Sequence, residues 1–341
     1  MRIRQSGTPG YSAPPTSVDD HTTLEPPQGP SRVSLVAHTG SRGMVRPALR
    51  AGVAVAAPAL RALPQGLGIP LTRKADQALF WLRPPRGTRL SRVRHDHWRA
   101  EWVRGPGPHR GPEVIMYMHG GADVTGGLNS WRRMVGRLSK AAYGIPVFNL
   151  EYRLAPKATV SDAMEDALSA YRWLLDHGTP ANRIVLAGDS FGAGLAFATV
   201  LGARAAGLPD PAGVVAISPV LDFDFATKAA HPNAARDPFT PSQLSALVDV
   251  ARARGLVNAP SPVDGDLTDF PPVLMQVGST EIFRADCEQM AVRLEQAGVP
   301  YRLQVWDRQL HVWHLFADVI PEARQAIADI AAFVDQVTSQ H

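Results

Sequence analysis

The sequence predicts an α/β fold in which helices cover both faces of a mostly parallel central sheet. After residue 95, short apolar runs rich in β-branched residues alternate with amphipathic helices, which is typical of βαβ units around a sheet buried on both sides. One such helix is expected between residues 164 and 175, where apolar side chains recur at helical spacing and Gly178 follows as a stop signal. The runs expected to form strands are residues 114–118, 146–150, 184–187, 214–217, 273–277 and 301–305.

Three segments depart from this alternation. Residues 1–40 are dominated by Pro, Ser, Thr and Gly and hold too little apolar area to offset the entropy of ordering, so we expect a disordered tail. Residues 41–95 contain Ala- and Leu-rich helical pieces broken by prolines, and the α/β domain is expected over residues 96–341. Residues 225–265 interrupt the rhythm before the fifth strand, with a helix starting at Ser242, which indicates an insertion over the functional site.

Composition excludes several classes of protein. The chain has 341 residues, 45% apolar and 19% charged, which is enough for a full core. Its single cysteine, Cys287, excludes a disulfide framework and a cysteine-based zinc or iron–sulfur cluster. No run approaches about 18 consecutive apolar residues, so no integral membrane segment is expected, and the lack of a readable signal peptide favours a cytoplasmic location.

Charge is distributed unevenly along the chain. The net charge is +4, but the first 110 residues carry 17 basic and 6 acidic side chains, whereas the remainder carries 18 and 25. This asymmetry would favour contact with an anionic surface. The basic stretch 83–110, however, lacks the interleaved aromatics and helical periodicity of a nucleic-acid binder. We therefore expect a solvated arginine-rich face and no nucleic-acid partner.

The most specific motif is Gly188-Asp189-Ser190-Phe191-Gly192, a G-x-S-x-G. It directly follows the expected strand RIVLA and directly precedes a helix of small residues. A nucleophile on a sharp strand-to-helix turn needs glycine on both sides, because the strained backbone leaves no room for a Cβ atom. The helix N-terminus also directs its N–H groups toward developing negative charge. Ser190 is therefore the candidate nucleophile.

A second motif, His119-Gly120-Gly121-Ala122, ends the expected strand VIMYM. Small residues there let backbone N–H groups reach the oxyanion of an acyl-transfer intermediate. An α/β hydrolase builds its oxyanion hole from this loop and from the residue after the nucleophile. The candidate oxyanion-hole residues are thus Gly120, Gly121, Ala122 and Phe191.

Together these motifs make the chain resemble the hormone-sensitive-lipase-like family of α/β-hydrolase-fold carboxylesterases. The matching pieces occur in the family's order over roughly residues 85–340: HGGA at 119–122, YRLAP at 152–156, GDSFGAG at 188–194, GSTE at 278–281 and LHVWHLF at 310–316. The resemblance implies an α/β-hydrolase fold and a Ser-acid-His triad. It also implies a largely helical cap that includes N-terminal helices, here residues 41–95, no cofactor, and hydrolysis of small acyl esters.

The resemblance assigns the acid to Glu281 and the base to His311. Each follows an expected strand at the carboxyl edge of the sheet, and the order Ser, acid, His is the one this fold uses. Asp286 competes for the acid role, although it is placed to open the next helix, where a carboxylate serves the helix dipole. His314 competes for the base role, but packing on the following segment is the favoured interpretation. The pair His311 and His314 lacks a third ligand at matching spacing, so no metal is expected.

Other polar residues near these motifs receive structural interpretations. His119 is expected to stabilise a turn by hydrogen bonding, and Asp189 and Asp222 to hold loops.

The chain departs from the family pattern at four positions. Ala122 and Asp123 stand where a third glycine and an aromatic are common, and a carboxylate near the oxyanion would oppose its charge unless Asp123 turns away or pairs with an arginine. Phe191 replaces a frequent alanine, which places a ring beside the acyl site. Gln309 stands where methionine is usual, and no functional consequence of this change follows from the sequence.

The predicted function is that of a serine carboxylesterase acting on short to medium acyl esters. Ser190 would attack, His311 would move the proton and Glu281 would orient the imidazole. The expected partner is a small-molecule ester, and a homodimer is left open. Alternatives are an amidase or peptidase with the same triad, a ligand receptor that has lost turnover, and a protein bound to an anionic surface through its basic N-terminal third.

Overall fold

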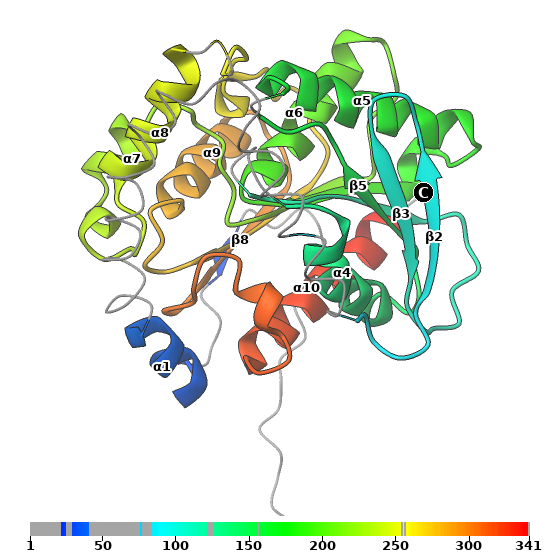
Figure 1. The fold of residues 1–341 in the computed structure, drawn as a ribbon, viewed down its shortest axis with the longest axis horizontal. Helices are drawn as coiled ribbons and strands as arrows, with labels where there is room; N and C mark the ends of the chain where they lie inside the picture. The colour runs from blue at the N-terminus through cyan, green and yellow to red at the C-terminus, as the bar shows by residue number, and fades with distance from the viewer. Residues whose placement is uncertain are drawn as a thin grey trace, which may run out of the picture.

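The computed structural model describes residues 22–24, 29–40, 76, 83–121, 126–155, 157–253, 255 and 257–339. Figure 1 shows a central sheet with helices on both sides. The strands are β1 (Thr22–Leu24), β2 (Arg89–Arg94), β3 (Arg99–Arg104), β4 (Val114–Met118), β5 (Val147–Glu151), β6 (Ile184–Asp189), β7 (Gly213–Ile217), β8 (Val273–Gly278) and β9 (Tyr301–Trp306).

The helices belong to the layers around this sheet and to the segments between strands. The α-helices are α1 (Arg32–Gly40), α4 (Leu128–Ala141), α5 (Val160–Asp176), α6 (Phe191–Ala205), α7 (Ala226–Ala230), α8 (Pro241–Ala253), α9 (Arg284–Gln296) and α10 (Pro321–Ser339). Short 3₁₀ turns are η3 (Ala181–Arg183), η4 (Pro232–Ala235), η5 (Pro262–Asp264) and η6 (Trp313–Phe316). None of the helices in the described ranges is long and apolar enough to cross a membrane.

In the described part of the chain, the strands form one sheet in the order β1-β9-β8-β7-β6-β4-β5-β3-β2. All six predicted strands are confirmed as β4 to β9, and neighbours among them run parallel. The antiparallel strands β2 and β3 extend one edge. Met118 pairs with Gly188 and Gly278 pairs with Trp306, so the carboxyl ends of these parallel strands meet at one edge of the sheet. The fold is an α/β-hydrolase fold.

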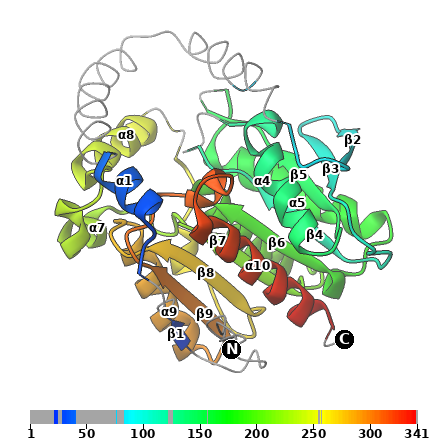
Figure 2. The same ribbon diagram turned by 90° about the horizontal axis from the view of Figure 1, so that it is seen from below.

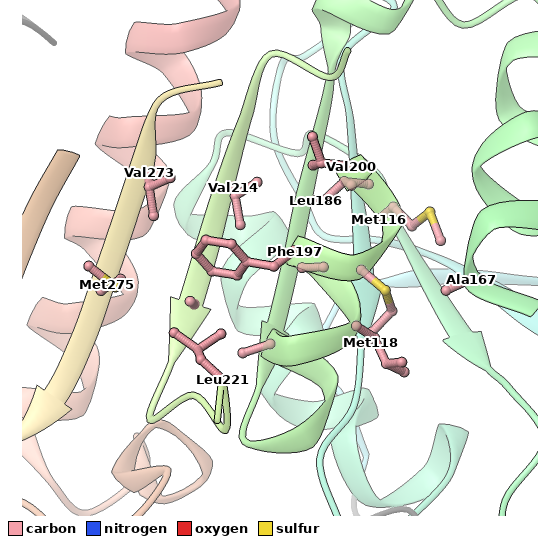
Figure 3. Packing of buried hydrophobic residues seen from close by; sticks show 14 of the residues in the cluster. Met116, Met118, Ala167, Leu186, Phe197, Val200, Val214, Leu221, Val273 and Met275 are labelled. Carbon is pink, nitrogen blue, oxygen red and sulfur yellow. The ribbon is translucent and has the colours of Figure 1, made fainter. Parts of the chain in front are cut away.

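Side chains alternate between two buried layers, as the period of two in a strand requires. In β4, Met116 and Met118 face α5, α6 and α9, whereas Ile115 and Tyr117 face α4 and α10. Figure 3 shows the first layer, where Phe197 of α6 packs among side chains of the sheet. Figure 2 shows α10 running along the opposite face. Burial on both faces explains why the central strands are apolar at nearly every position.

The helix predicted over residues 164–175 is confirmed as part of α5. Thr159 caps it, accepting from the N–H of Asp162 while the Asp162 carboxylate accepts from the Thr159 N–H, which is a capping box. Gly178 follows the helix with a φ of 87°, a left-handed conformation that glycine adopts without strain. The predicted stop signal is therefore confirmed.

The expected disordered tail over residues 1–40 is wrong for two segments. β1 pairs in parallel with β9, and helix α1 is anchored by Ser31 and Ser34, whose hydroxyls donate to the Glu322 carboxylate at 3.0 and 2.9 Å. These segments are ordered by contacts with the far end of the chain, which local composition does not reveal.

The predicted start of the α/β domain at residue 96 is also wrong, because β2 begins at Arg89. This strand lies at the sheet edge with mostly exposed side chains, so it lacks the apolar run that marks a buried strand. The helical cap predicted over residues 41–95 otherwise lies largely outside the described residues. The insertion predicted over residues 225–265 is helical, containing α7 and α8, which lie together in Figure 1. The predicted helix start at Ser242 is one residue after the observed start.

Candidate active site

Ser190 occupies a strained turn between β6 and α6. Its φ of 52° and ψ of −122° are unusual for a residue with a Cβ atom. The turn is held because the Ser190 N–H donates to the Ile217 carbonyl at 2.8 Å. A Cβ atom at Gly192 would collide with the carbonyl oxygens of Met118 and His119. Only glycine fits there, which is the physical content of the G-x-S-x-G motif.

The structure brings the predicted nucleophile, base and acid together. His311 Nε2 lies 3.1 Å from Ser190 Oγ, and His311 Nδ1 lies 2.7 Å from Glu281 Oε2. The three residues follow β6, β9 and β8, whose carboxyl ends meet at one edge of the sheet. The imidazole is also flanked by two aromatic rings, those of Phe239 and Phe283, with ring centroids at 5.5 and 4.8 Å.

The Glu281 carboxylate is fixed by two further donors. Its Oε1 accepts from Ser218 Oγ at 2.9 Å and from the N–H of Gly278 at 2.7 Å. Ser218 Oγ in turn accepts from the N–H of Val312 at 3.3 Å, so it links the acid to the residue after the base. Sequence reasoning missed Ser218. Its place directly after β7 was the available signal, because that is where polar groups reach this edge of the sheet.

Charge around His311 favours the protonated imidazole. Burial alone would lower the pKa of His311, but the hydrogen bond to Glu281 and that residue's charge raise it. The more distant charges of Asp237 and Asp189 act in the same direction. The pKa of His311 therefore lies above its usual value of about 6.5. This field stabilises the cation that forms when the imidazole accepts a proton.

Asp286, the competing candidate for the acid, does not contact His311. One of its oxygens accepts from the N–H groups of Leu221 and Asp222 at 2.8 and 3.1 Å. The other forms an ion pair with Lys228 Nζ at 2.7 Å, and both side chains are fully buried. Asp286 lies in the first turn of α9, as predicted, but its carboxylate also has partners outside this helix. It joins α9 to α7 of the insertion, and burial raises its pKa to about 6.

The oxyanion-hole prediction needs one correction. The N–H of Gly120 donates to Asp189 Oδ1 at 3.0 Å, so Gly120 is not available to an oxyanion. The same oxygen accepts from Tyr117 Oη at 2.8 Å, and burial raises the pKa of Asp189 to about 6. Asp189 thus holds the loop, as predicted. Gly121 has a φ of 113°, a conformation that favours glycine.

Of the two remaining oxyanion-hole candidates, Phe191 lies in the described part of the chain. Phe191 is the first residue of α6, where N–H groups have no acceptor within the helix. The predicted donor Ala122 and the neighbouring Asp123 lie outside the described residues.

The other histidines have structural partners. His119 Nδ1 lies 2.7 Å from the Gly120 carbonyl oxygen, and burial lowers the pKa of His119, which confirms its predicted role in the turn. His314 is buried with Nε2 2.7 Å from Gln276 Oε1, and burial lowers its pKa to about 3. His314 is thus a packing residue, as predicted. Among the described residues there is no cluster of three or more His, Cys, Asp or Glu suited to a metal ion.

The remaining sequence departures also have defined surroundings. The Phe191 ring is 6% exposed and lies against Tyr152 and Phe223, with ring centroids at 6.3 and 6.4 Å. The Oε1 atom of the buried Gln309 lies 3.3 Å from Ser34 Oγ of α1, so this contact connects the N-terminal helix to the loop that carries the base. Asp222 accepts from the N–H of Asp224 at 2.8 Å, which agrees with its predicted role in a loop.

Comparisons with known proteins agree with this geometry. A family model described as alpha/beta hydrolase fold matches residues 115–315. An acetyl-hydrolase of Streptomyces hygroscopicus is 38% identical over 255 residues, covering 72% of this chain and 82% of that protein. The carboxylesterase/phospholipase LipF of Mycobacterium tuberculosis is 34% identical over 325 residues, covering 91% of this chain and 83% of that protein.

Solved structures agree as well. The crystal structure of an esterase from the bacterial hormone-sensitive lipase family matches with a TM-score of 0.76 and 33% identity, covering 91% of this chain and 100% of that one. The resemblance seen in the motifs is thereby confirmed, and the chain belongs to the hormone-sensitive-lipase-like family of α/β-hydrolase-fold carboxylesterases, enzymes that hydrolyse carboxylic esters.

Proposed function

We propose that the protein is a serine carboxylesterase that cleaves short- to medium-chain acyl esters through Ser190, His311 and Glu281. The observation that carries this proposal is the continuous relay from Ser190 Oγ to His311 Nε2 at 3.1 Å and from His311 Nδ1 to Glu281 Oε2 at 2.7 Å. The relay starts on a strained turn at a helix N-terminus, where a nucleophile and an oxyanion are both favoured.

The reaction follows from these contacts in two halves. Ser190 Oγ attacks the ester carbonyl carbon while His311 Nε2 takes its proton, giving a tetrahedral oxyanion. The bond to the alcohol oxygen then breaks, and His311 donates the proton to the departing alcohol. Water then attacks the acyl-enzyme while His311 takes its proton, the bond between the acyl carbon and Ser190 Oγ breaks, His311 returns the proton to Ser190, and the carboxylic acid product leaves. Glu281 keeps the Nδ1 proton in place and stabilises the imidazolium.

Oxyanion stabilisation is assigned to the backbone N–H groups of Phe191 and Gly121, with Ala122 as a further donor. Phe191 supports this role by its place as the first residue of α6. Gly121 supports it by following Gly120, whose own N–H is held by Asp189 and fixes the start of the loop. The N–H of Gly120 is not assigned to the oxyanion hole, because it already donates to Asp189.

The acyl range is tested with p-nitrophenyl esters of increasing acyl length, on wild type and on Phe191→Ala. Each accommodated methylene contributes about 0.8 kcal/mol, so kcat/KM should rise about threefold to fourfold per carbon until the phenyl ring is met. We expect the optimum between about four and eight acyl carbons, and at longer chains in Phe191→Ala. The variant keeps the backbone N–H that the oxyanion needs.

An unchanged optimum would reject the role of Phe191 in acyl length. Its contacts with Tyr152 and Phe223 would then be purely structural, and the variant would lose about 3 to 5 kcal/mol of unfolding free energy with its length profile unmoved. Matched p-nitroanilides in the same assay test the amidase alternative. Faster hydrolysis of the anilides than of the esters would replace the esterase proposal.

A further inference from the structure

The insertion between β7 and β8 reaches the loop that carries the acid. This loop, residues 278–282, is called the acid loop below. Two polar side chains of the insertion, Asn233 and Asp237, are almost fully buried against it, with 2% and 1% exposure. Buried polar groups are costly unless they form hydrogen bonds, so their partners show what they do.

Asn233 donates hydrogen bonds to backbone carbonyl groups of the acid loop. Its Nδ2 donates to the carbonyl of Ser279 at 2.9 Å and to the carbonyl of Glu281 at 2.8 Å. Both amide hydrogens are therefore used on this loop.

Asp237 holds the same loop by an N–H group. Its Oδ2 accepts from the N–H of Ile282 at 2.6 Å, and its Oδ1 accepts from the N–H of Phe239 at 2.7 Å. The ring of Phe239 lies edge-on to the imidazole of His311, with ring centroids at 5.5 Å and an interplanar angle of 72°. Asp237 therefore connects the backbone next to the acid with a ring packed on the base.

The two contacts meet on one peptide unit. The carbonyl of Glu281 and the N–H of Ile282 belong to the same planar peptide unit. Asn233 donates to this carbonyl, and Asp237 accepts from this N–H. Fixing this plane fixes the backbone torsion at residue 281 and hence the direction in which the Glu281 side chain leaves the chain.

We propose that Asn233 and Asp237 are positioning residues that orient the peptide unit between residues 281 and 282 so that Glu281 reaches His311. The insertion is then a part of the catalytic assembly as well as a cover for it. This proposal rests on the proposed function, because it concerns the acid of the same triad. A displacement of a catalytic group by about 1 Å, even one caused by a mutation far from the reacting atoms, can lower the rate about 100-fold.

The test compares Asp237→Asn and Asn233→Ala with wild type. Asparagine at position 237 offers one carbonyl oxygen for two N–H donors, so at least one contact is lost. We expect kcat to fall about 10- to 100-fold while KM changes less than about twofold. The matched control is Ser261→Ala, which removes an acceptor of the Phe223 N–H from the same insertion and does not touch the acid loop. Its kcat should stay within about twofold of wild type.

A mutant cycle separates positioning from general damage. If Asp237 acts through Glu281, Asp237→Asn should cost less than about threefold when Glu281 is already glutamine. Equal losses in both backgrounds, or a full loss in Ser261→Ala, would overturn the proposal. Should Asp237→Asn fail to fold, Asn233→Ala enters the same cycle with the same expectation.

A spectroscopic readout does not depend on turnover. The His311 Nδ1 proton shared with Glu281 should give a strongly downfield proton NMR signal, weakened or shifted in Asp237→Asn and retained in Ser261→Ala. An unchanged signal in Asp237→Asn would contradict positioning, even in an enzyme whose substrate is not an ester. Ester hydrolysis that survives Ser190→Ala would instead refute the proposed function while leaving this NMR result standing.

Discussion

The Glu281 carboxylate is held so that only one of its oxygens faces the imidazole. Its Oε1 receives Ser218 Oγ and the N–H of Gly278, while Oε2 receives His311. In Glu281→Gln the amide oxygen is expected to keep the two donors, which turns the NH₂ group toward His311 Nδ1. Nδ1 would then have to accept, and the proton would move to Nε2, where it blocks transfer from Ser190. We expect kcat to fall about 10³- to 10⁴-fold, as for the acid-to-amide change in a serine protease.

The same variant should change the pH dependence. If His311 is the base, as proposed, its neutral form is the active one, so kcat/KM should rise with pH through the His311 pKa, with a midpoint above about 6.5 in wild type. Removing the Glu281 charge destabilises the imidazolium, so the midpoint in Glu281→Gln should move to lower pH. An unchanged or higher midpoint in Glu281→Gln would contradict Glu281 as the partner of the imidazole.

At this scale the sequence predicted the residues with motifs and not those without. Ser190 could be identified from its glycines, and Glu281 and His311 from strand ends, family resemblance and chain order. Asp237 has no such pattern, and Ser218 follows a strand end but lies in no motif. The contacts of both residues with the acid loop join distant parts of the chain. The hydrogen bond that withdraws the Gly120 N–H was hidden for the same reason, since its acceptor, Asp189, lies 69 residues away.

Elements buried on both faces were predictable, and elements at the edge were not. The strands β4 to β9 consist of buried positions with few exceptions, so hydrophobicity marked them. β2 is RLSRVR and almost wholly exposed, and it is a strand because β3 pairs with it. β1 and α1 likewise depend on partners beyond residue 300.

The ion pair between α7 and α9 should contribute strongly to stability. Asp286→Asn leaves the Lys228 ammonium buried without its counter-ion, so we expect a loss of about 3 to 5 kcal/mol in unfolding free energy. The double variant with Lys228→Met should recover part of this loss. Asparagine still supplies an acceptor for the N–H groups of Leu221 and Asp222, and no buried charge remains. Urea unfolding measures all three variants.

The control lies on the same helix. Glu288 pairs with Arg284 and lies 3.3 Å from His231 Nε2 of the insertion, but its side chain is 43% exposed and solvent weakens both interactions, so Glu288→Gln should cost at most about 1 kcal/mol. Similar small costs for Asp286→Asn would show that the buried pair does not anchor the insertion.

The whole molecule assembles its site from segments far apart in sequence. The parallel sheet brings Ser190, Glu281 and His311 to one edge, and the insertion adds polar contacts around the acid. Helix α1 reaches the same region through Gln309. The sequence predicted the sheet and the helical insertion, because both have local patterns. It missed the N-terminal elements β1 and α1, which are held by contacts with residues beyond 300.

The most direct test of the account is the activity of Ser190→Ala on a short acyl ester, combined with fluorophosphonate labelling of the wild type. If Ser190 is the nucleophile of a triad that acts as a unit, kcat should fall on the order of 10⁶-fold, and peptide mass spectrometry should find the label on Ser190. Two results would contradict the account. One is that Ser190→Ala, free of wild-type enzyme, retains more than about 3% of the activity, which is far above the activity that remains when a triad is removed. The other is a label on a different serine.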